Sequence, residues 1–506
     1  MMRQTFQTFA LVTPVRVASL ATALVVCSGC SQSSPGVSTA PSAPGTVVVA
    51  PISGASPFPP GCAAQPEAPF GERLDDAEME SFLAVNPRNP ANLVVGWMQD
   101  LYAGFVTAAT MDGGRHWAIV PVPGTSSCSG GDFDLAADPV LSFGLDGTLY
   151  LMGFSLDLSA KETPVPTRTR MFSTTSSDGG LSWGPLVEVT GGYGTLHDMP
   201  TLAADPARPC TAYLAWTDEY TAFGPASIGL MFARTDDCGR SWSAPVTVFA
   251  PNFTPMPFSV TLGSKMLAMK DGSLTIVTTT LSSLLAVSNP ELSAFGPESV
   301  VAFRSIDGGT TWTSARHIAE FVNGPFHDPE TGEKVLALPY ILSASVAPDG
   351  TAYVAWRQQL TEGIADIRLA RTDDHGETWG EPIVVRASDT QMMIPTLATA
   401  ADGTVAVTYY DLRNDAVADP ALSTDVWISQ SADGGNSWEE THVAGPFDLR
   451  QAAKRLVPVE GLMVGDYAGL VAVPDGFAAS FAMSGTPATA GASDIFFAKI
   501  VGAVAQ

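Results

Sequence analysis

Basic residues are scarce in this sequence. Its 506 residues contain 25 Lys and Arg against 51 Asp and Glu, a formal net charge of −26. A surface with this excess of acidic groups repels the phosphate backbone of a nucleic acid, so we exclude a nucleic acid partner. The acidic surface suits divalent cations, and it also suits simple solubility.

Helical periodicity and long apolar runs are missing as well. The apolar run Leu20–Val26 is too short to span a bilayer, and no long segment repeats apolar residues at helical spacing. By contrast, the chain has 47 Gly and 39 Pro, which indicate many turns. Together these features predict an all-β chain.

One pattern, Ser/Thr-x-Asp-x-Gly-x-x-Trp, occurs six times at intervals of about 60 to 70 residues. In such a turn the Asp side chain accepts backbone N–H bonds, Gly supplies a positive φ, and the hydroxyl adds a second local bond. We expect each Trp to pack back against its own unit. The aspartates are therefore predicted to be structural; they are Asp112, Asp178, Asp237, Asp307, Asp374 and Asp433.

This pattern is the Asp-box, and over about residues 74 to 500 the chain resembles the bacterial sialidase-like propeller family with Asp-box (BNR) repeats. The resemblance implies four-stranded blades around a central axis, with each box between the third and fourth strands of its blade. One stretch departs from the family. Where catalytic members usually carry Phe/Tyr-Arg-Ile/Leu-Pro, this chain has Phe70-Gly71-Glu72-Arg73-Leu74-Asp75.

A second series of turns gives the number of blades. Asp-Gly or Pro-rich turns occur at seven places, the last at Asp475-Gly476, whose box would fall near or beyond the end of the chain. The last blade would then have strands at about Gly469–Val473, Phe477–Met483 and Asp494–Ile500, with Thr46–Ala50 as its fourth strand. We expect a seven-bladed β-propeller closed by this N-terminal strand, with six blades and an appended sheet as the alternative.

The N-terminal segment resembles an export signal. Arg3 and Arg16 precede the apolar run, and Cys27-Ser28-Gly29-Cys30 resembles a bacterial lipoprotein cleavage box with Cys30 as the lipidated residue. Ordinary signal-peptide cleavage is the alternative. We expect a signal in residues 1–30, a flexible tether in 31–45 and one propeller domain in 46–506. The protein would lie at the bacterial cell envelope, secreted or held to the membrane only by its lipid.

The blade topology predicts how the remaining four cysteines pair. Cys210 and Cys238 fall in two turns at the same end of one blade, whereas Cys62 and Cys128 fall in connections at the opposite end. We therefore expect the disulfides Cys62–Cys128 and Cys210–Cys238. These four residues form no Cys-x-x-Cys pair and have no nearby His, so we expect no metal at them.

The loops at the end opposite the boxes hold the polar and aromatic residues that suggest a funnel. The candidates for catalytic roles are Arg357 and Arg413 for carboxylate binding, Asp411, Asp218 or Asp466 as acid/base, and Tyr467 as nucleophile. For ligand binding they are Trp216, Arg357, Tyr410 and Arg413. His197 and His327 lie in links between blades.

Two functions remain open from the sequence. The first is a non-catalytic propeller that binds a glycan or a cell-envelope protein in this funnel. The second, implied by the resemblance, is an exo-α-sialidase or a related glycoside hydrolase, which would need an arginine triad, a Tyr nucleophile and an Asp acid/base. Neither requires a cofactor, although a carboxylate-bound Ca²⁺ is left open.

Overall fold

The computed structural model describes residues 46–62, 76–158, 166–193, 195–220, 228–250, 260–281, 298–322, 324–338, 340–416, 420–455, 460–486 and 491–502. Predictions for Cys30, for the signal and tether in residues 1–45, and for Arg73 lie outside these residues. Within them, no helix is long and apolar enough to cross a membrane. Apart from two 3-10 turns, Ser127–Ser129 and Leu449–Gln451, the regular elements described are β-strands.

The described strands form eight four-stranded sheets. Seven are antiparallel meanders, in which consecutive strands are hydrogen-bonded neighbours. The first two meanders are β2 (Met79–Asn86), β3 (Asn89–Gln99), β4 (Gly104–Thr110) and β5 (Ala118–Pro121), then β6 (Leu135–Phe143), β7 (Leu149–Leu158), β8 (Pro166–Ser176) and β9 (Val187–Tyr193). The next two are β10 (Thr195–Ala204), β11 (Ala212–Tyr220), β12 (Ile228–Thr235) and β13 (Val246–Phe249), then β14 (Val260–Ala268), β15 (Leu274–Leu281), β16 (Glu298–Ser305) and β17 (Arg316–Phe321). The fifth and sixth are β20 (Ser343–Val346), β21 (Ala352–Thr361), β22 (Ile364–Thr372) and β23 (Ile383–Arg386), then β24 (Met392–Thr399), β25 (Val405–Asp411), β26 (Ser423–Ser431) and β27 (Glu439–Asp448).

The seventh meander joins both ends of the described chain. It consists of β30 (Gly469–Val473), β31 (Gly476–Met483) and β32 (Asp494–Val501), with β1 (Thr46–Pro51) as its outer strand. β1 runs antiparallel to β32, with Thr46 opposite Val501 and Pro51 opposite Phe496. This pairing covers the edge that β32 would otherwise expose.

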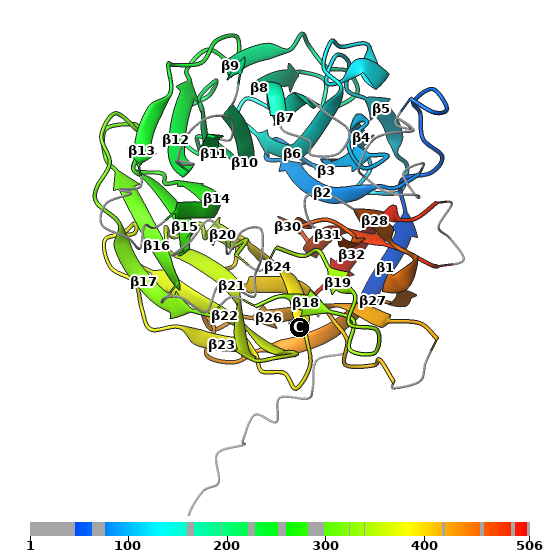
Figure 1. Cartoon of the computed structure of the whole chain (residues 1–506). Coiled ribbons are helices and arrows are strands. Elements are labelled where there is room, and N and C mark those ends of the chain that lie inside the picture. Colours follow the sequence, from blue (N-terminus) through cyan, green and yellow to red (C-terminus); the bar gives the residue numbers. More distant parts are fainter. Residues whose placement is uncertain are drawn as a thin grey trace, which may run out of the picture. The chain divides into compact units, whose positions relative to one another are not determined.

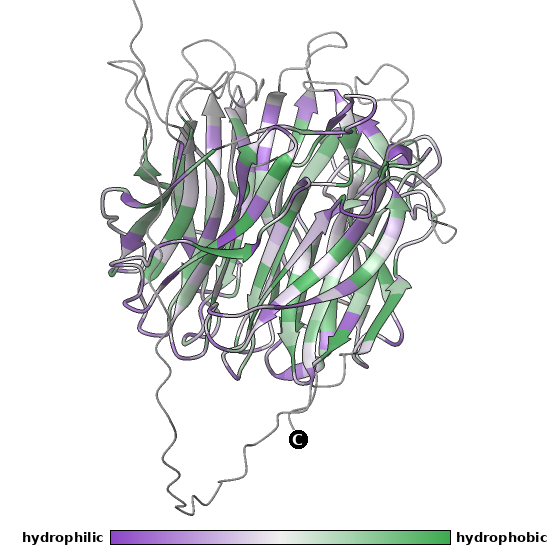
Figure 2. Cartoon of the chain, turned by 90° about the horizontal axis from the view of Figure 1, so that it is seen from below, coloured by the Kyte–Doolittle hydropathy of each residue, from purple (hydrophilic) through white to green (hydrophobic). Residues whose placement is uncertain are grey.

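The seven meanders are arranged in a ring (Figure 1). Their first strands contact one another in the cyclic order β2, β6, β10, β14, β20, β24, β30 and back to β2, so these strands are innermost. This arrangement confirms an all-β propeller. Figure 2 shows hydrophobic residues along many of the strands and hydrophilic residues in many of the turns that join them.

The eighth sheet is built from short strands in two links of the ring. It contains β18 (Phe326–His327) and β19 (Lys334–Val335), which precede β20, and β28 (Ala453–Arg455) and β29 (Gly461–Met463), which precede β30. β19 and β29 pair in parallel at Val335 and Leu462. Because this sheet adds to the seven meanders, the expected number of seven blades stays a prediction.

Each of the six box turns joins the third and fourth strands of its sheet, as predicted. Asp307 shows the common geometry: its carboxylate accepts bonds from the Ser305 hydroxyl at 2.8 Å and from the N–H and hydroxyl of Thr311 at 2.9 and 2.6 Å. These bonds, led by that of the Thr311 hydroxyl, lower the pKa of Asp307 to about 2. The box aspartates are therefore ionised parts of the turns.

The box tryptophans bond both within their own unit and between sheets. As expected, the indole N–H groups of Trp117, Trp312 and Trp438 donate at 3.1 Å to the glycine carbonyl of their own box. The indole N–H of Trp183 instead donates to Thr107 at 3.1 Å, and that of Trp242 to Ser173 at 2.8 Å, and both acceptors lie on the third strand of the preceding sheet. These two boxes thus help to hold neighbouring sheets together.

Two disulfides are present, and they are the pairs expected from the sequence. Cys62 and Cys128 have a Cα–Cα distance of 5.6 Å, and Cys210 and Cys238 one of 4.0 Å. The first links the segment after β1 to the connection between the first two meander sheets, and the second links two turns of one sheet.

Candidate functional site

Irregular points in the innermost strands shape the site. In five of these strands the hydrogen-bonded register slips, twice in β2 and once in each of the others. One slip in each strand contains a residue with a positive φ: Glu80 (58°), Asp138 (59°), Met199 (52°), Gly263 (66°) and Ile394 (54°). Such β-bulges redirect side chains. Since four of the five are not glycine, they hold the kind of backbone strain that gathers at functional sites.

The bulges bring carboxylates together near the axis; they are Glu80, Asp138, Asp198 and Asp466. Burial, followed by the charges of Asp138 and Asp466, raises the pKa of Glu80 well above its usual range. Burial and the charge of Asp198 likewise raise the pKa of Asp138. Glu80 and Asp138 are hydrogen-bonded to each other. This hydrogen bond raises the pKa of Glu80 and lowers that of Asp138, so it favours the proton on Glu80.

One amine and two aromatic rings complete this cluster. The Nζ atom of Lys265 lies 4.6 Å from the ring centre of Tyr467 and 5.3 Å from that of Phe82, and the two ring centres are 5.8 Å apart. Burial lowers the pKa of Lys265 to about 8, although Asp138 and Glu80 oppose this shift. The cluster therefore holds an amine with a lowered pKa beside carboxyl groups whose pKa values are raised.

A cavity of about 170 Å³ opens beside the amine and the two rings, and Glu80, Asp138 and Asp198 are not among its lining residues. Its lining comes from six of the innermost strands and the links before them, and includes Phe82, Lys265, Ile394, Asp466 and Tyr467. Small-molecule sites usually begin at about 300 Å³. The axial cavity, as we call it, therefore has room for one end of a ligand rather than a whole oligosaccharide.

A larger hollow of about 520 Å³ lies at the box end of the ring, between the first and last meanders. Two carboxylates in its lining have structural partners. Asp112 accepts hydrogen bonds within its box turn, and Asp475 pairs with Lys499 at 2.7 Å. Its size favours this hollow as the ligand site, but the nearby acid and amine groups with shifted pKa values favour the axial cavity.

Two of the predicted residues, Asp466 and Tyr467, line the axial cavity. Asp466 accepts a bond from the N–H of Leu338 at 2.7 Å, which ties the link before β30 to the link before β20. Burial, followed by the charge of Asp138, raises the pKa of Tyr467 well above its usual range. Tyr467 is therefore a neutral phenol at physiological pH.

Asp218 belongs to a separate buried group on β10 and β11. Its Oδ1 lies 2.5 Å from Nδ1 of His197 and accepts the indole N–H of Trp216 at 2.6 Å. Gln99 and Gln358 accept bonds in the same way from Trp97 and Trp356, at the ends of the second strands of two other sheets. This repeated pairing indicates a structural role for Asp218, while Nε2 of His197 remains buried without a hydrogen-bond partner.

Arg357 lies inside the protein rather than in a funnel wall. Its guanidinium donates to the carbonyl oxygens of Met392 at 2.7 Å and Gly324 at 2.9 Å, and to the side chain of Gln359. Burial lowers its pKa to about 10. These internal bonds occupy all three nitrogens, so the side chain fixes the strand ends around it.

Arg413 and Asp411 form an ion-pair network away from the axial cavity. Arg413 binds Asp411 and donates to Glu440 at 2.5 and 2.9 Å, and its guanidinium lies 4.0 Å from the ring centre of Trp427. Asp411 is fully buried. The two predicted arginines therefore have partners within the protein, and neither lines the cavity.

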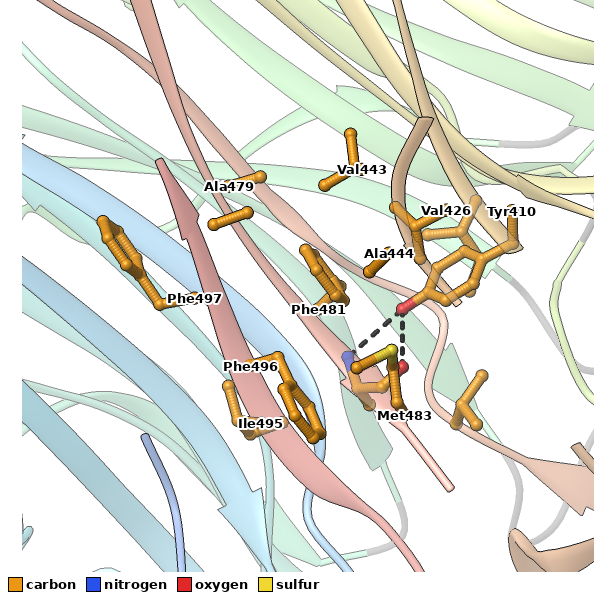
Figure 3. Close-up of a cluster of buried hydrophobic side chains, with 14 of the residues drawn as sticks. Tyr410, Val426, Val443, Ala444, Ala479, Phe481, Met483, Ile495, Phe496 and Phe497 are labelled. Carbon is orange, nitrogen blue, oxygen red and sulfur yellow. Dashed lines mark hydrogen bonds between the residues drawn. The ribbon is translucent and has the colours of Figure 1, made fainter. Parts of the chain in front are cut away.

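Tyr410 and Trp216, two predicted ligand-binding residues, are core residues. Figure 3 shows Tyr410 among buried hydrophobic side chains, with its hydroxyl bonded to the backbone of the neighbouring last sheet. That hydroxyl donates to the carbonyl of Ala482 at 3.0 Å and accepts its N–H at 3.1 Å. The side chain of Trp216 is fully buried. These two aromatic side chains at strand ends are packed in the hydrophobic core.

His327 lies on β18 in the eighth sheet, where its backbone exchanges bonds with the Gln391 side chain. The neighbouring Asp328 pairs with Arg450 at 2.7 Å, and it takes a lowered pKa from that guanidinium despite its burial. The link that contains His327 and Asp328 therefore has a structural role.

Glu80, Asp138 and Lys265 were not among the residues predicted from the sequence. A signal for three of the bulges was present, because an x-Pro-x-Leu tetrad occurs in three innermost strands: Asp138-Pro139-Val140-Leu141, Met199-Pro200-Thr201-Leu202 and Ile394-Pro395-Thr396-Leu397. Aligning these tetrads would have placed Asp138 beside the axis. Glu80 and Lys265 lie at bulges without that proline, so they carried no such signal.

No protein-family model matches the chain, and no curated protein sequence matches it. Solved structures with a similar fold include a Hadza microbial sialidase, with 14% identity over 81% of this chain and 73% of that chain and a TM-score of 0.45. An α-L-arabinanase from Penicillium chrysogenum shares 13% identity over 72% and 92% of the two chains, with a TM-score of 0.43. An ulvan lyase shares 12% identity over 85% and 95%, with a TM-score of 0.49. The likeness concerns the fold alone.

Proposed function

We propose that this chain is an exported, sialidase-like propeller with Asp-box repeats that recognises a glycan, one end of which enters the axial cavity. The observation that carries the proposal is the grouping of Lys265, Asp466, Tyr467 and Phe82 in one lining. Carboxylates and an amine bind sugar hydroxyls, and aromatic faces pack against the C–H groups of a sugar ring. Export through the N-terminal signal and a lipid on Cys30 are part of this proposal.

The loss of stability that comes with burying these charged groups supports a functional role for the cluster. Several carboxyl groups and an amine are held at least partly out of water, which lowers stability unless another role retains them. Groups with strongly shifted pKa values inside a cavity mark functional sites more often than chance. The cluster therefore favours a ligand over a purely structural axis.

The charge of the cluster favours neutral or amino sugars. Four carboxyl groups lie near one amine, and among the described lining residues Lys265 is the only cation. An acidic sugar such as a sialoside would meet this negative field without an arginine to bind its carboxylate. We therefore expect neutral glycans to bind and sialosides to fail.

A glycan array probed with the purified protein tests this proposal. We expect Lys265→Met to lose at least tenfold in binding, because it removes the only described cationic donor of the lining. Lys499→Met is the matched control, since Lys499 pairs with Asp475 at the box end, and it should bind like the wild type. An array that stays blank for every glycan would contradict glycan recognition and favour a cell-envelope protein as the partner.

A second function, hydrolysis of a glycosidic bond, is favoured by the hydrogen-bonded Glu80–Asp138 pair. Burial and neighbouring charges raise the pKa values of both carboxyl groups, and such chemistry uses a pair of carboxyl groups as its acid and base. The test is release of reducing ends from a panel of neutral polysaccharides. Asp138→Asn should remove the activity while glycan binding persists; a wild type without activity on any substrate would leave only the binding function.

A further inference from the structure

A second group of buried carboxylates lies where the ring closes, separate from the axial cluster. Asp76 and Glu78 directly precede β2, and Asp100 follows β3. Asp494 is the first residue of β32, which pairs with β1. The group, which we call the seam cluster, therefore joins segments from both ends of the described chain.

The oxygen atoms of the seam cluster converge on one point. One carboxylate oxygen from each of Asp76, Glu78 and Asp100 lies within 4.8 Å of the others. Oxygens that share one Ca²⁺ at about 2.3 to 2.6 Å lie at most about 5 Å apart. The spacing therefore fits a single ion.

One atom of this cluster points to a ligand independently of the clustering. Glu78 is fully buried, and its Oε1 accepts the side-chain amide of Gln99 at 2.5 Å. Its Oε2 is buried and has no hydrogen-bond partner. A buried carboxylate oxygen without a donor is costly, and a cation bound there would remove that cost.

Among the described residues, the neighbouring groups orient the carboxylates but form no ion pair with Asp76, Glu78 or Asp100. The Ser56 hydroxyl donates to Asp100 at 2.5 Å, and the Ser53 hydroxyl donates to Asp494 at 2.9 Å.

We propose that Asp76, Glu78 and Asp100, assisted by Asp494, bind a Ca²⁺ ion that fastens the closure of the ring. The ligands are oxygens alone, which suits Ca²⁺ and disfavours Zn²⁺, a metal that prefers nitrogen and sulfur. Mg²⁺ retains several of its waters and demands near-octahedral geometry, which a site so deeply buried does not suit. The ion would tie the start of β2, the end of β3 and the start of β32.

Thermal unfolding of the whole protein, stripped with EGTA and then titrated with Ca²⁺, tests the site. At a Ca²⁺ concentration one hundred times Kd, we expect Tm to rise by about 3 °C. Tb³⁺ in place of Ca²⁺ should luminesce when tryptophan is excited, because the Trp97 indole donates to Gln99 beside the site at 2.9 Å. No change in Tm together with no luminescence would overturn the proposal, and so would an equal response to Mg²⁺.

A variant assigns the response to the seam cluster. Glu78→Gln removes a buried charge, so in EGTA its Tm should equal or exceed that of the wild type, whereas the Ca²⁺ shift and the Tb³⁺ signal should be lost. Asp475→Asn, which breaks the exposed pair with Lys499 on the same sheet, is the control and should keep both. If Glu78→Gln retained the full Ca²⁺ shift, the ion would bind elsewhere and the proposal would fail.

Discussion

At the scale of single residues, the aspartates of this protein behave in two opposite ways. In a box turn the carboxylate accepts backbone and hydroxyl hydrogen bonds, and these hold the pKa of Asp433 at about 2. Near the axis, burial among other carboxylates raises the pKa of Asp138. The same side chain thus stabilises a turn in one place and opposes folding in the other.

The box aspartates should make stability depend on acid pH. Burial alone would raise the pKa of Asp374, but the hydroxyl and N–H of Thr378 and the hydroxyl of Thr372 hold it at about 2. Because this pKa is lower than in the unfolded chain, the contribution is present above about pH 4 and is lost as pH falls towards 2. We expect Asp374→Asn to lower the free energy of unfolding at pH 7, and urea denaturation measures how the difference shrinks in acid. The adjacent Asp373 lies 3.7 Å from Arg371, so Asp373→Asn should change the free energy of unfolding little. Equal losses in the two variants would contradict the role given to the box aspartate.

The axial carboxylates should show the reverse dependence. The raised pKa of Asp138 in the folded state means that its contribution is present below the unfolded pKa of about 4 and is lost as pH rises through the folded value. Asp138→Asn keeps a side chain that tolerates positive φ and should therefore be more stable than the wild type at pH 7. Calorimetry at pH 5 and pH 8 would measure a gain that grows with pH. A loss of stability at pH 8 would show that Asp138 is a structural carboxylate.

At the scale of elements, the turns were predictable and the bulges were not. Box turns and Asp-Gly turns show themselves because their residue types are required by local hydrogen bonds and positive φ, and they placed β30 and β32 within about a residue. Positive φ at the bulges has no such local signature, because contacts among innermost strands impose it; only the repeated x-Pro-x-Leu tetrad marks Asp138, Met199 and Ile394, and no pattern marks Glu80. Asp466 and Tyr467 were predicted as candidates and line the axial cavity, whereas Lys265 was not predicted.

The bulge in β14 allows a direct test of whether contacts with neighbouring segments hold a bulge in place. Gly263 has a φ of 66°, and a Cβ built there would lie 2.6 Å from the carbonyl oxygen of Tyr340 in the link before β20. Gly272 has a φ of 86° in a turn, and its Cβ would meet nothing within 4 Å. Gly272→Ala should cost about 1 to 2 kcal/mol for backbone strain alone, and Gly263→Ala about 1 to 3 kcal/mol more for the clash. If urea denaturation showed the same loss of unfolding free energy for both variants, the link before β20 would move to make room, and the bulge would not be held by that link.

At the scale of the whole molecule, the seam between the two ends of the chain depends on several ties. β1 pairs with β32, Cys62 is bonded to Cys128, and the seam cluster joins β2, β3 and β32. Only the strand and the disulfide were expected from the sequence. The seam cluster was not expected, because its members are distant in the chain and the fold alone brings them together.

Loss of the Cys62–Cys128 bond should weaken this seam. The bond spans 66 residues, and the chain-entropy model gives at most about 4 kcal/mol for a loop of that length. We expect Cys62→Ser combined with Cys128→Ser to lower the free energy of unfolding by about 2 to 4 kcal/mol in urea denaturation. Glycan binding should persist at temperatures where the variant is folded, because the axial cavity is lined by other residues. Loss of binding in the folded variant would place the ligand at the seam.

The most direct test of the central claim is a crystal structure of the protein with the neutral glycan that binds best on the array. One end of the glycan should lie in the axial cavity, in contact with Lys265, Asp466 and Tyr467. A glycan bound instead in the hollow at the box end, beside Asp112 and Lys499, would contradict the proposed function.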